Sequence, residues 1–370
     1  MIRDILRGDE RIDRALRELY DSYGYSRFKM SKFEEYELYV KNKDFLAGDR
    51  MITFTDGDGT LLALKPDVTI SIIKNTLQDE GGIRKVYYNE NVYRVDRGQT
   101  RFREILQTGL ECVGAVDAYQ IFEVIYLAVR SLGRISPDYM LDLSHMGLVT
   151  GLMAVAGVPQ ESYARVLGCI REKNPTELSQ VIEGLRLDTR GTALLQLLID
   201  LYGDLKSTLE VLEPYCTAPE AQEALLELRT VDRMLRASGL CSRVQLDFSV
   251  TSDMGYYNGI LFRGFVKGVP EGILSGGQYD RLVEKMGKSF RAIGFAITLN
   301  ELERLAAREG KYDVDVLLRY DEDTELEELC RRSHELVSAG KRIVTQAGLC
   351  VGLRARETVD LRGERGSGHE

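Results

Sequence analysis

A glutamine and a glutamate flank a glycine in the segment EILQTGLECVG, which is typical of a β-strand. Side chains two residues apart share one face of a strand. The predicted polar face therefore carries Gln107, Gly109 and Glu111, and the predicted core face carries Leu106 and Leu110. The glycine lets a ligand approach the backbone, and a cationic or amine-bearing ligand would compensate a buried carboxylate. A solvent-facing strand or an internal ion pair would explain the same pattern.

Arginines crowd the segment YRVDRGQTRFR, which lies just upstream and includes Arg94, Arg101 and Arg103. Guanidinium groups match the geometry of phosphate oxygens, so the cluster is a possible anion-binding site. A solvated charged loop is the alternative, and it is the more common situation.

Two glycine-rich segments further along the chain carry aromatic residues. GYYNG contains Tyr257, and SGGQYD contains Tyr279 beside paired glycines. Glycine pairs permit unusual backbone conformations or the close approach of a ligand. Each segment alone is weak evidence, because aromatic residues on strands usually belong to the core.

The order of predicted elements favours an α+β fold. Short helices alternate with strand-like segments over residues 1 to about 150, and residues 118–240 are predicted to be mainly helical. A second strand-rich block follows over residues 242–297. Strand–helix alternation of the Rossmann type is missing from the pattern, which favours a mostly antiparallel sheet backed by helices. The segment from Tyr312 onward predicts a strand, a helix and a strand in a small separate α/β unit.

Composition excludes several classes of protein. The chain has 370 residues, a net charge of −9, six cysteines without a CxxC pair and three histidines. We therefore expect no structural zinc site, no disulfide framework and no cofactor. No apolar run approaches the roughly 18 residues of a membrane span, and no signal-peptide core opens the chain, so a cytoplasmic location is expected. The acidic balance argues against nucleic acid as a partner.

Taken in order, these segments resemble histidyl-tRNA synthetase, a class II aminoacyl-tRNA synthetase, over residues 1–308. FTDGDGTLLALKPDVT resembles the segment that ends in Arg-Pro-Glu-Gly-Thr, and NENVYRVDRGQTRFREILQTGLECVG resembles motif 2 and the strand after it. SGGQYDRL resembles Gly-Gly-Arg-Tyr-Asp, and IGFAITLNELERL resembles motif 3. The resemblance implies a six- or seven-stranded antiparallel sheet with flanking helices, a helical insertion at about residues 150–240, and a dimer.

The resemblance also implies that the histidine-binding residues are largely retained. The positions that hold the amino group and read the imidazole ring in that family are occupied here by Asp67, Thr69, Gln107, Glu111, Tyr257 and Tyr279. The side chain of Asp67 is shorter than that of the glutamate at this position in the family.

The residues for adenylation differ from the family pattern. The arginine that assists carboxylate activation is replaced by Ser252, and the motif 3 arginine that contacts the ATP phosphates is replaced by Glu301. A reversed charge beside a triphosphate repels it, at about 4 kcal/mol for a pair 4 Å apart in an effective dielectric near 20. We therefore expect no catalytic residues for adenylation.

A synthetase-like body of this kind, followed by a shortened anticodon-binding-like unit over residues 312–370, resembles the regulatory subunits of ATP phosphoribosyltransferase. That resemblance implies a partnership with the short catalytic subunit, a requirement for its activity, and feedback by L-histidine in the first step of histidine biosynthesis. The alternatives are a divergent active histidyl-tRNA synthetase and a stand-alone histidine sensor.

Overall fold

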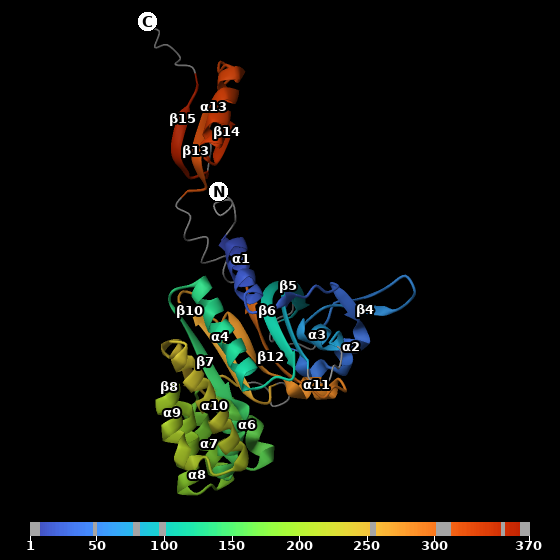
Figure 1. The fold of residues 1–370 in the computed structure, drawn as a ribbon, viewed down its shortest axis with the longest axis vertical. Helices are drawn as coiled ribbons and strands as arrows, with labels where there is room; N and C mark the ends of the chain where they lie inside the picture. The colour runs from blue at the N-terminus through green and yellow to red at the C-terminus, as the bar shows by residue number, and fades with distance from the viewer. Residues whose placement is uncertain are drawn as a thin grey trace. The chain divides into compact units, whose positions relative to one another are not determined.

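A computed structural model describes seven ranges of the chain, namely 8–46, 50–76, 82–95, 101–251, 257–300, 312–348 and 352–362. The chain divides into two compact units, Glu10–Leu302 and a smaller one that includes Glu303–Glu370. Figure 1 labels many of the helices and strands of both units.

A nine-stranded sheet forms the frame of the larger unit. Its spatial order is β1 (Ser26–Arg27), β5 (Ile83–Arg94), β6 (Arg103–Gly114), β12 (Arg291–Thr298), β11 (Leu274–Gln278), β10 (Ile260–Val266), β7 (Tyr139–His145), β9 (Val244–Asp247) and β8 (Tyr202–Asp204). The six strands from β5 to β7 pair antiparallel throughout, whereas β1 and β9 join the sheet in parallel. The predicted mostly antiparallel sheet is confirmed, but it has nine strands where the resemblance implied six or seven.

The long hairpin of β5 and β6 follows from its sequence. Both strands have 12 residues, and they pair in register from Ile83↔Gly114 to Arg94↔Arg103. Residues with strong β propensity, such as Val86, Tyr88 and Val92, supply the buried positions of β5.

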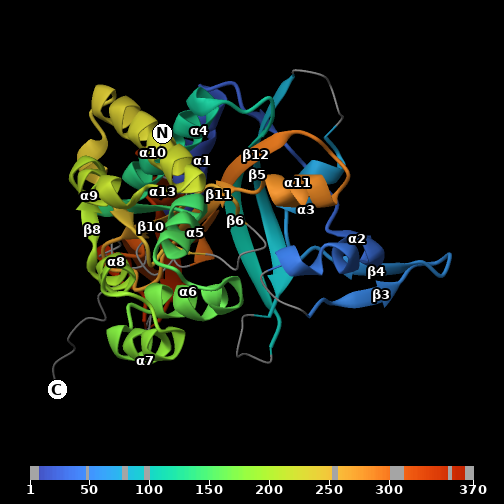
Figure 2. The same ribbon diagram turned by 90° about the horizontal axis from the view of Figure 1, so that it is seen from below.

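Helices cover the sheet and fill one end of the larger unit. They are α1 (Gly8–Asp21), α2 (Tyr36–Lys41), α3 (Thr69–Lys74), α4 (Ala118–Ile135), α5 (Met146–Val155), α6 (Tyr163–Arg171), α7 (Pro175–Leu185), α8 (Thr189–Asp200), α9 (Leu205–Leu212), α10 (Pro219–Ala237) and α11 (Asp280–Lys285). Helix α4 begins with a capping box at Asp117 and packs on β7, β10 and β12. Figure 2 shows α5–α10 gathered at one end of the sheet, and α2 and α3 lie toward the other end.

A small second sheet lies near α2. Its order is β2 (Phe33–Glu35), β4 (Leu61–Leu64) and β3 (Thr53–Thr55), all antiparallel. An Asp-Gly turn joins β3 to β4, where Gly59 has a φ of 90°. Such a conformation favours glycine, so this turn explains the glycine at position 59.

The smaller unit is a compact α/β layer of its own. Strands β13 (Val314–Tyr320), β14 (Ile343–Ala347) and β15 (Ala355–Asp360) form a parallel sheet in the order β14-β13-β15, and α13 (Leu326–Ser338) connects β13 to β14. The predicted strand–helix–strand order is confirmed, and β15 was not predicted.

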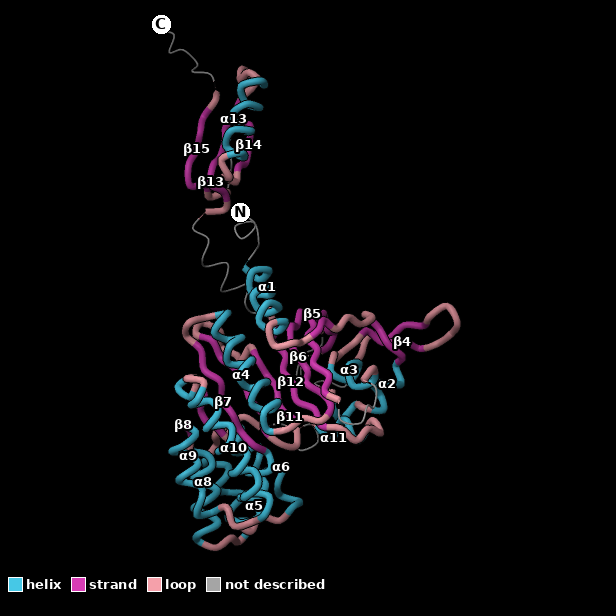
Figure 3. The backbone as a smooth tube through the Cα atoms, in the orientation of Figure 1, coloured by secondary structure: helices cyan, strands magenta, loops and turns pink. Residues whose placement is uncertain are grey.

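Residues 118–240 are mainly helical, as predicted, but the prediction did not include a strand that lies between α4 and α5. Tyr139–His145 is strand β7, which pairs with both β10 and β9 and so lies inside the main sheet. The segment is short and lies between two long helices, so a periodicity judged over the whole region hides it. Figure 3 shows this strand entering the otherwise helical region.

Among the described helices, none is long and apolar enough to cross a membrane.

Candidate functional site

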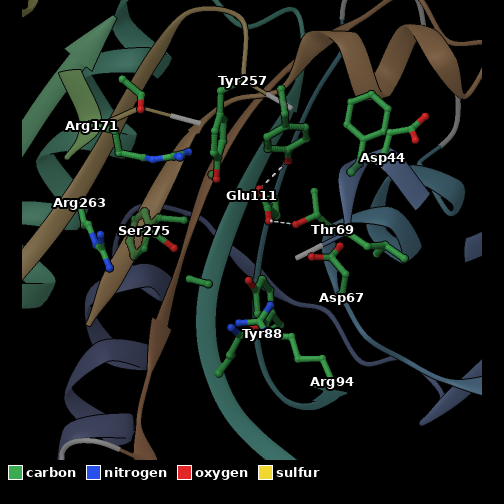
Figure 4. A pocket seen from close by; sticks show the side chains of 18 residues that line it. Asp44, Asp67, Thr69, Tyr88, Arg94, Glu111, Arg171, Tyr257, Arg263 and Ser275 are labelled. Carbon is green, nitrogen blue, oxygen red and sulfur yellow. Dashed lines mark hydrogen bonds between the residues drawn. The ribbon is translucent and has the colours of Figure 1, made fainter. Parts of the chain in front are cut away.

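A cavity of about 630 Å³ opens over the middle of the main sheet. It is lined by all six residues to which the family resemblance assigned a histidine-binding role, namely Asp67, Thr69, Gln107, Glu111, Tyr257 and Tyr279. These residues come from the start of α3, from β6 and from the ends of the glycine-rich segments, so the fold brings together positions more than 200 residues apart. Figure 4 shows several of them around Glu111.

Glu111 lies at the base of the cavity on strand β6, which confirms the predicted polar face. Its side chain is 2% exposed, and its carboxyl oxygens accept hydrogen bonds from the Thr69 hydroxyl at 2.9 Å and the Tyr279 hydroxyl at 2.5 Å. Burial raises the pKa of this carboxyl to about 8, although the two hydroxyl donors act in the opposite direction. Burial therefore favours the protonated form of this group in the ligand-free protein, and a bound cation would favour its ionised form.

Close backbone packing holds Glu111 in place. Gly294 faces it across the β6–β12 pair, and a methyl group at Gly294 would lie 1.6 Å from Glu111 Oε2. The glycine is thus required for the carboxyl to occupy this position.

The start of helix α3 supplies the acidic side of the cavity. Asp67 Oδ1 accepts a hydrogen bond from the backbone N–H of Ile70 at 3.0 Å, which satisfies one of the free N–H groups in the first turn of the helix. Burial raises the pKa of Asp67, whereas the hydrogen bond from Ile70 and the positive charge of Arg94 lower it. Two carboxyl groups, Asp67 and Glu111, therefore share this side of the site.

Aromatic side chains form much of the remaining wall. Tyr88 and Tyr279 are each 2% exposed, and Tyr257 also lines the cavity. Small residues make room for the rings, since a methyl group at Gly109 would lie 2.7 Å from the Tyr88 hydroxyl oxygen and one at Gly277 would lie 2.8 Å from Tyr257 Cδ1. The glycines of the SGGQYD segment therefore serve packing around an aromatic wall.

The predicted arginine cluster is only partly assembled beside this site. Arg94 and Arg103 face each other across the β5–β6 pair, and both line a second cavity of about 360 Å³. Arg94 lines both cavities, whereas Arg101 lines neither of the two. The possible anion-binding role of the three arginines stays a prediction.

Two further arginines line the main cavity and were not predicted from the sequence. Arg263 comes from β10 and Arg171 from the last turn of α6. A charged residue inside the apolar strand ILFRGF was a usable signal for Arg263. The sequence around Arg171 contains no comparable signal, because a cation at the end of a helix is common.

The two positions that depart from the synthetase pattern, Ser252 and Glu301, lie outside the described residues. Thr251, which immediately precedes Ser252, lines both cavities.

The arrangement suits a small zwitterion with a second polar group. Carboxyl and hydroxyl groups on one side can bind an amine or an imidazole ring, and arginines on the other side can bind a carboxylate. Within the described ranges, no group of three or more His, Cys, Asp or Glu side chains could hold a metal ion.

Curated relatives share most of the chain. An ATP phosphoribosyltransferase regulatory subunit of Alkaliphilus metalliredigens is 27% identical over 299 residues, which cover 79% of this chain and 75% of that protein. A protein of the same description in Acetivibrio thermocellus is 28% identical over 340 residues, which cover 87% and 80% of the two chains.

Solved structures share the fold. A crystal structure of an ATP phosphoribosyltransferase regulatory subunit/histidyl-tRNA synthetase from Bacillus halodurans aligns with a TM-score of 0.78 at 23% identity and covers 96% of this chain and 94% of that one. A chain of the ATP phosphoribosyl transferase (HisG:HisZ) complex from Thermotoga maritima aligns with a TM-score of 0.60 at 18% identity, covering 78% and 96%. The class II synthetase-like fold is therefore confirmed.

The family model for histidyl-tRNA synthetase matches residues 4–302, which include the whole described cavity. The chain belongs to the histidyl-tRNA synthetase family.

Proposed function

We propose that this protein is the regulatory subunit of ATP phosphoribosyltransferase in histidine biosynthesis, and that it binds L-histidine in the cavity at Glu111. In this function it assembles with the short catalytic subunit, is required for that subunit's activity and mediates feedback by histidine. The names of its curated relatives support the assignment.

The observation that carries the proposal is the buried carboxyl of Glu111. It lies 2% exposed in a cavity large enough for an amino acid, with hydroxyl donors that orient it. A cationic ligand stabilises the ionised form of such a carboxyl, because the ligand's charge replaces the solvent that the group has lost. L-Histidine supplies both an ammonium group and an imidazole ring.

Absence of catalysis is part of the same proposal. Ser252 and Glu301 replace two arginines of the synthetase pattern, and the net charge of −9 is unfavourable for binding a tRNA backbone. Residues 312–370 are proposed to be a shortened anticodon-binding-like unit. We further propose a cytoplasmic location and self-association as a dimer, with no nucleic acid or membrane as a partner.

Reconstitution with a short catalytic subunit from the same organism tests the function. The purified chain should co-purify with that subunit and raise its rate of phosphoribosyl transfer to ATP. Failure of the two proteins to associate, or an equal rate with and without the chain, would contradict the proposal and favour a stand-alone histidine sensor.

A divergent, active histidyl-tRNA synthetase is the second candidate, because the family match and the fold are shared with synthetases. Histidine-dependent exchange of pyrophosphate into ATP separates the two functions. We expect no exchange above background. Robust exchange would mean that other groups replace the arginines missing at Ser252 and Glu301.

A further inference from the structure

We propose that Tyr88 is a specificity-determining residue that binds, together with Asp67 and Gln107, the α-ammonium group of the amino acid in the cavity. This inference rests on the function proposed above. It adds to the site a residue that neither the strand pattern nor the family resemblance had assigned, and it makes the cavity selective for ligands with a free amine.

The Tyr88 hydroxyl is a buried polar group that lacks a protein partner. The residue is 2% exposed and lines the cavity. Within the described part of the chain, its hydroxyl has no hydrogen-bond partner. Buried polar groups of folded proteins almost always have a partner, and leaving one without any costs about 1–3 kcal/mol. A molecule bound in the cavity would supply that partner.

The hydroxyl lies over Gly109, between the side chains of Gln107 and Glu111. Tyr88 is the cross-strand partner of Gly109, and a methyl group at Gly109 would lie 2.7 Å from the hydroxyl oxygen. The ring therefore leans across β6 through space that a side chain at position 109 would fill. Gln107 and Glu111 share this face of the strand, each about 7 Å along it from Gly109, so a ligand at the hydroxyl is within reach of both.

Two neighbouring side chains also have acceptor capacity to spare. Gln107 is 8% exposed and lines the cavity, and its amide has no hydrogen-bond partner among the described residues. Asp67 Oδ1 accepts from the backbone N–H of Ile70, but a carboxylate offers about four lone-pair sites in all. Three oxygen-bearing groups in one cavity can therefore accept hydrogen bonds from a ligand.

The electrostatic environment of Tyr88 favours a cation. Burial, followed by the negative charges of Glu111 and Asp67, raises the pKa of the Tyr88 hydroxyl well above its ordinary value. The hydroxyl stays neutral, and its oxygen can accept a hydrogen bond from a charged N–H group. Such a charge-assisted hydrogen bond is roughly twice as strong as one between neutral groups.

The number of acceptors fits an ammonium group better than an imidazole ring. An ammonium group has three N–H donors that point in different directions, whereas each ring nitrogen carries at most one. Asp67 precedes α3, Gln107 lies on β6 and Tyr88 lies on β5, so the three acceptors come from three parts of the fold. In the view of Figure 4, Asp67 and Tyr88 both lie below Glu111. Glu111 then remains for the imidazole ring.

A comparison of three ligands in a Tyr88→Phe variant tests the inference. L-Histidine and histamine carry the amine, whereas 3-(imidazol-4-yl)propionate keeps the ring and the carboxylate but lacks the amine. We expect calorimetry to show L-histidine and histamine bound about 10- to 100-fold more weakly by the variant, and imidazolepropionate bound with unchanged affinity. Tyr87→Phe is the matched control, because Tyr87 is the half-buried neighbour on β5 and does not line the cavity.

Two results would overturn the role of Tyr88 while leaving histidine binding intact. Unchanged affinity of Tyr88→Phe for L-histidine would mean that the hydroxyl does not contact the ligand. An equal loss for all three ligands would mean that it shapes the cavity without binding the amine. If the wild-type chain and its complex with the catalytic subunit bind no histidine, the proposed function itself fails, and the assignment of Tyr88 fails with it.

A methylated amine tests the same contact if imidazolepropionate binds too weakly to be measured. Nα-Methyl-L-histidine keeps the positive charge but has one N–H fewer than L-histidine. We expect the wild type to prefer L-histidine by about 10-fold, and this preference to be at least about three-fold smaller in Tyr88→Phe, because the variant has already lost one of the three acceptors. An equal preference in the two proteins would also overturn the inference.

Discussion

Replacement of Glu111 by glutamine should change how the stability of the ligand-free protein depends on pH. The carboxyl has a pKa of about 8 in the folded protein, against an ordinary value of 4.5. Between these two pH values the unfolded chain has released the proton and the folded protein has retained it, so the folded state binds more protons and its stability falls as pH rises. The full difference corresponds to roughly 5 kcal/mol, most of it lost by pH 8.

Glutamine keeps the shape of the side chain but does not ionise. We therefore expect the free energy of unfolding of Glu111→Gln to fall less between pH 5 and pH 9 than that of the wild type, by up to roughly 4 kcal/mol. Urea unfolding of both proteins at pH 5, 7 and 9, followed by tyrosine fluorescence, measures this difference. Glu104→Gln is the control, because Glu104 is an exposed carboxylate on the same strand. Parallel pH profiles for the wild type and Glu111→Gln would refute the conclusion that burial holds this group protonated.

Three further substitutions test the packing and hydrogen bonds of the site. Tyr279→Phe removes the hydroxyl that donates to Glu111 at 2.5 Å, so calorimetry should show histidine binding weakened by about 1.5–3 kcal/mol. Tyr119→Phe is the control and should have no effect, because Tyr119 is 52% exposed. Gly294→Ala places a methyl group 1.6 Å from the Glu111 carboxyl and should abolish detectable histidine binding. Gly168→Ala is the control and should bind histidine normally, because the space around Gly168 is open. Normal histidine binding by Gly294→Ala would contradict the geometry of the site. Lys65→Met leaves Glu90 without its ion-pair partner at a site where the lysine is 1% exposed. The free energy of unfolding in urea should therefore fall by about 3–5 kcal/mol. A fall below about 1 kcal/mol would mean that water compensates the charge of Glu90.

The alternation of polar and apolar side chains around Glu111 could be predicted from the sequence, because β6 is one uninterrupted strand. A period of two then fixes which side chains share a face, and Gln107 and Glu111 do line one cavity. The partners of Glu111 could not be obtained from spacing. Thr69 and Tyr279 lie 42 and 168 residues away, and only the resemblance to a family placed them at the same site.

Two features depend on tertiary structure that the sequence does not display. Strand β7 is specified by its neighbours β10 and β9, which lie far along the chain, and its own seven residues resemble a break between helices. Arg171 lines the cavity because helix α6 ends beside it, and just beyond that end Lys173 Nζ lies 2.7 Å from Asp247 Oδ2. Neither interaction leaves a periodic signal.

Inhibition of the reconstituted complex by L-histidine tests the central claim most directly. The rate of the short catalytic subunit bound to this chain should fall as histidine is added, and the same complex with Glu111→Gln should require about 10- to 100-fold more histidine for the same inhibition. Equal sensitivity of the two complexes would place the effector site elsewhere. A wild-type complex that histidine does not inhibit would contradict the proposed regulatory function.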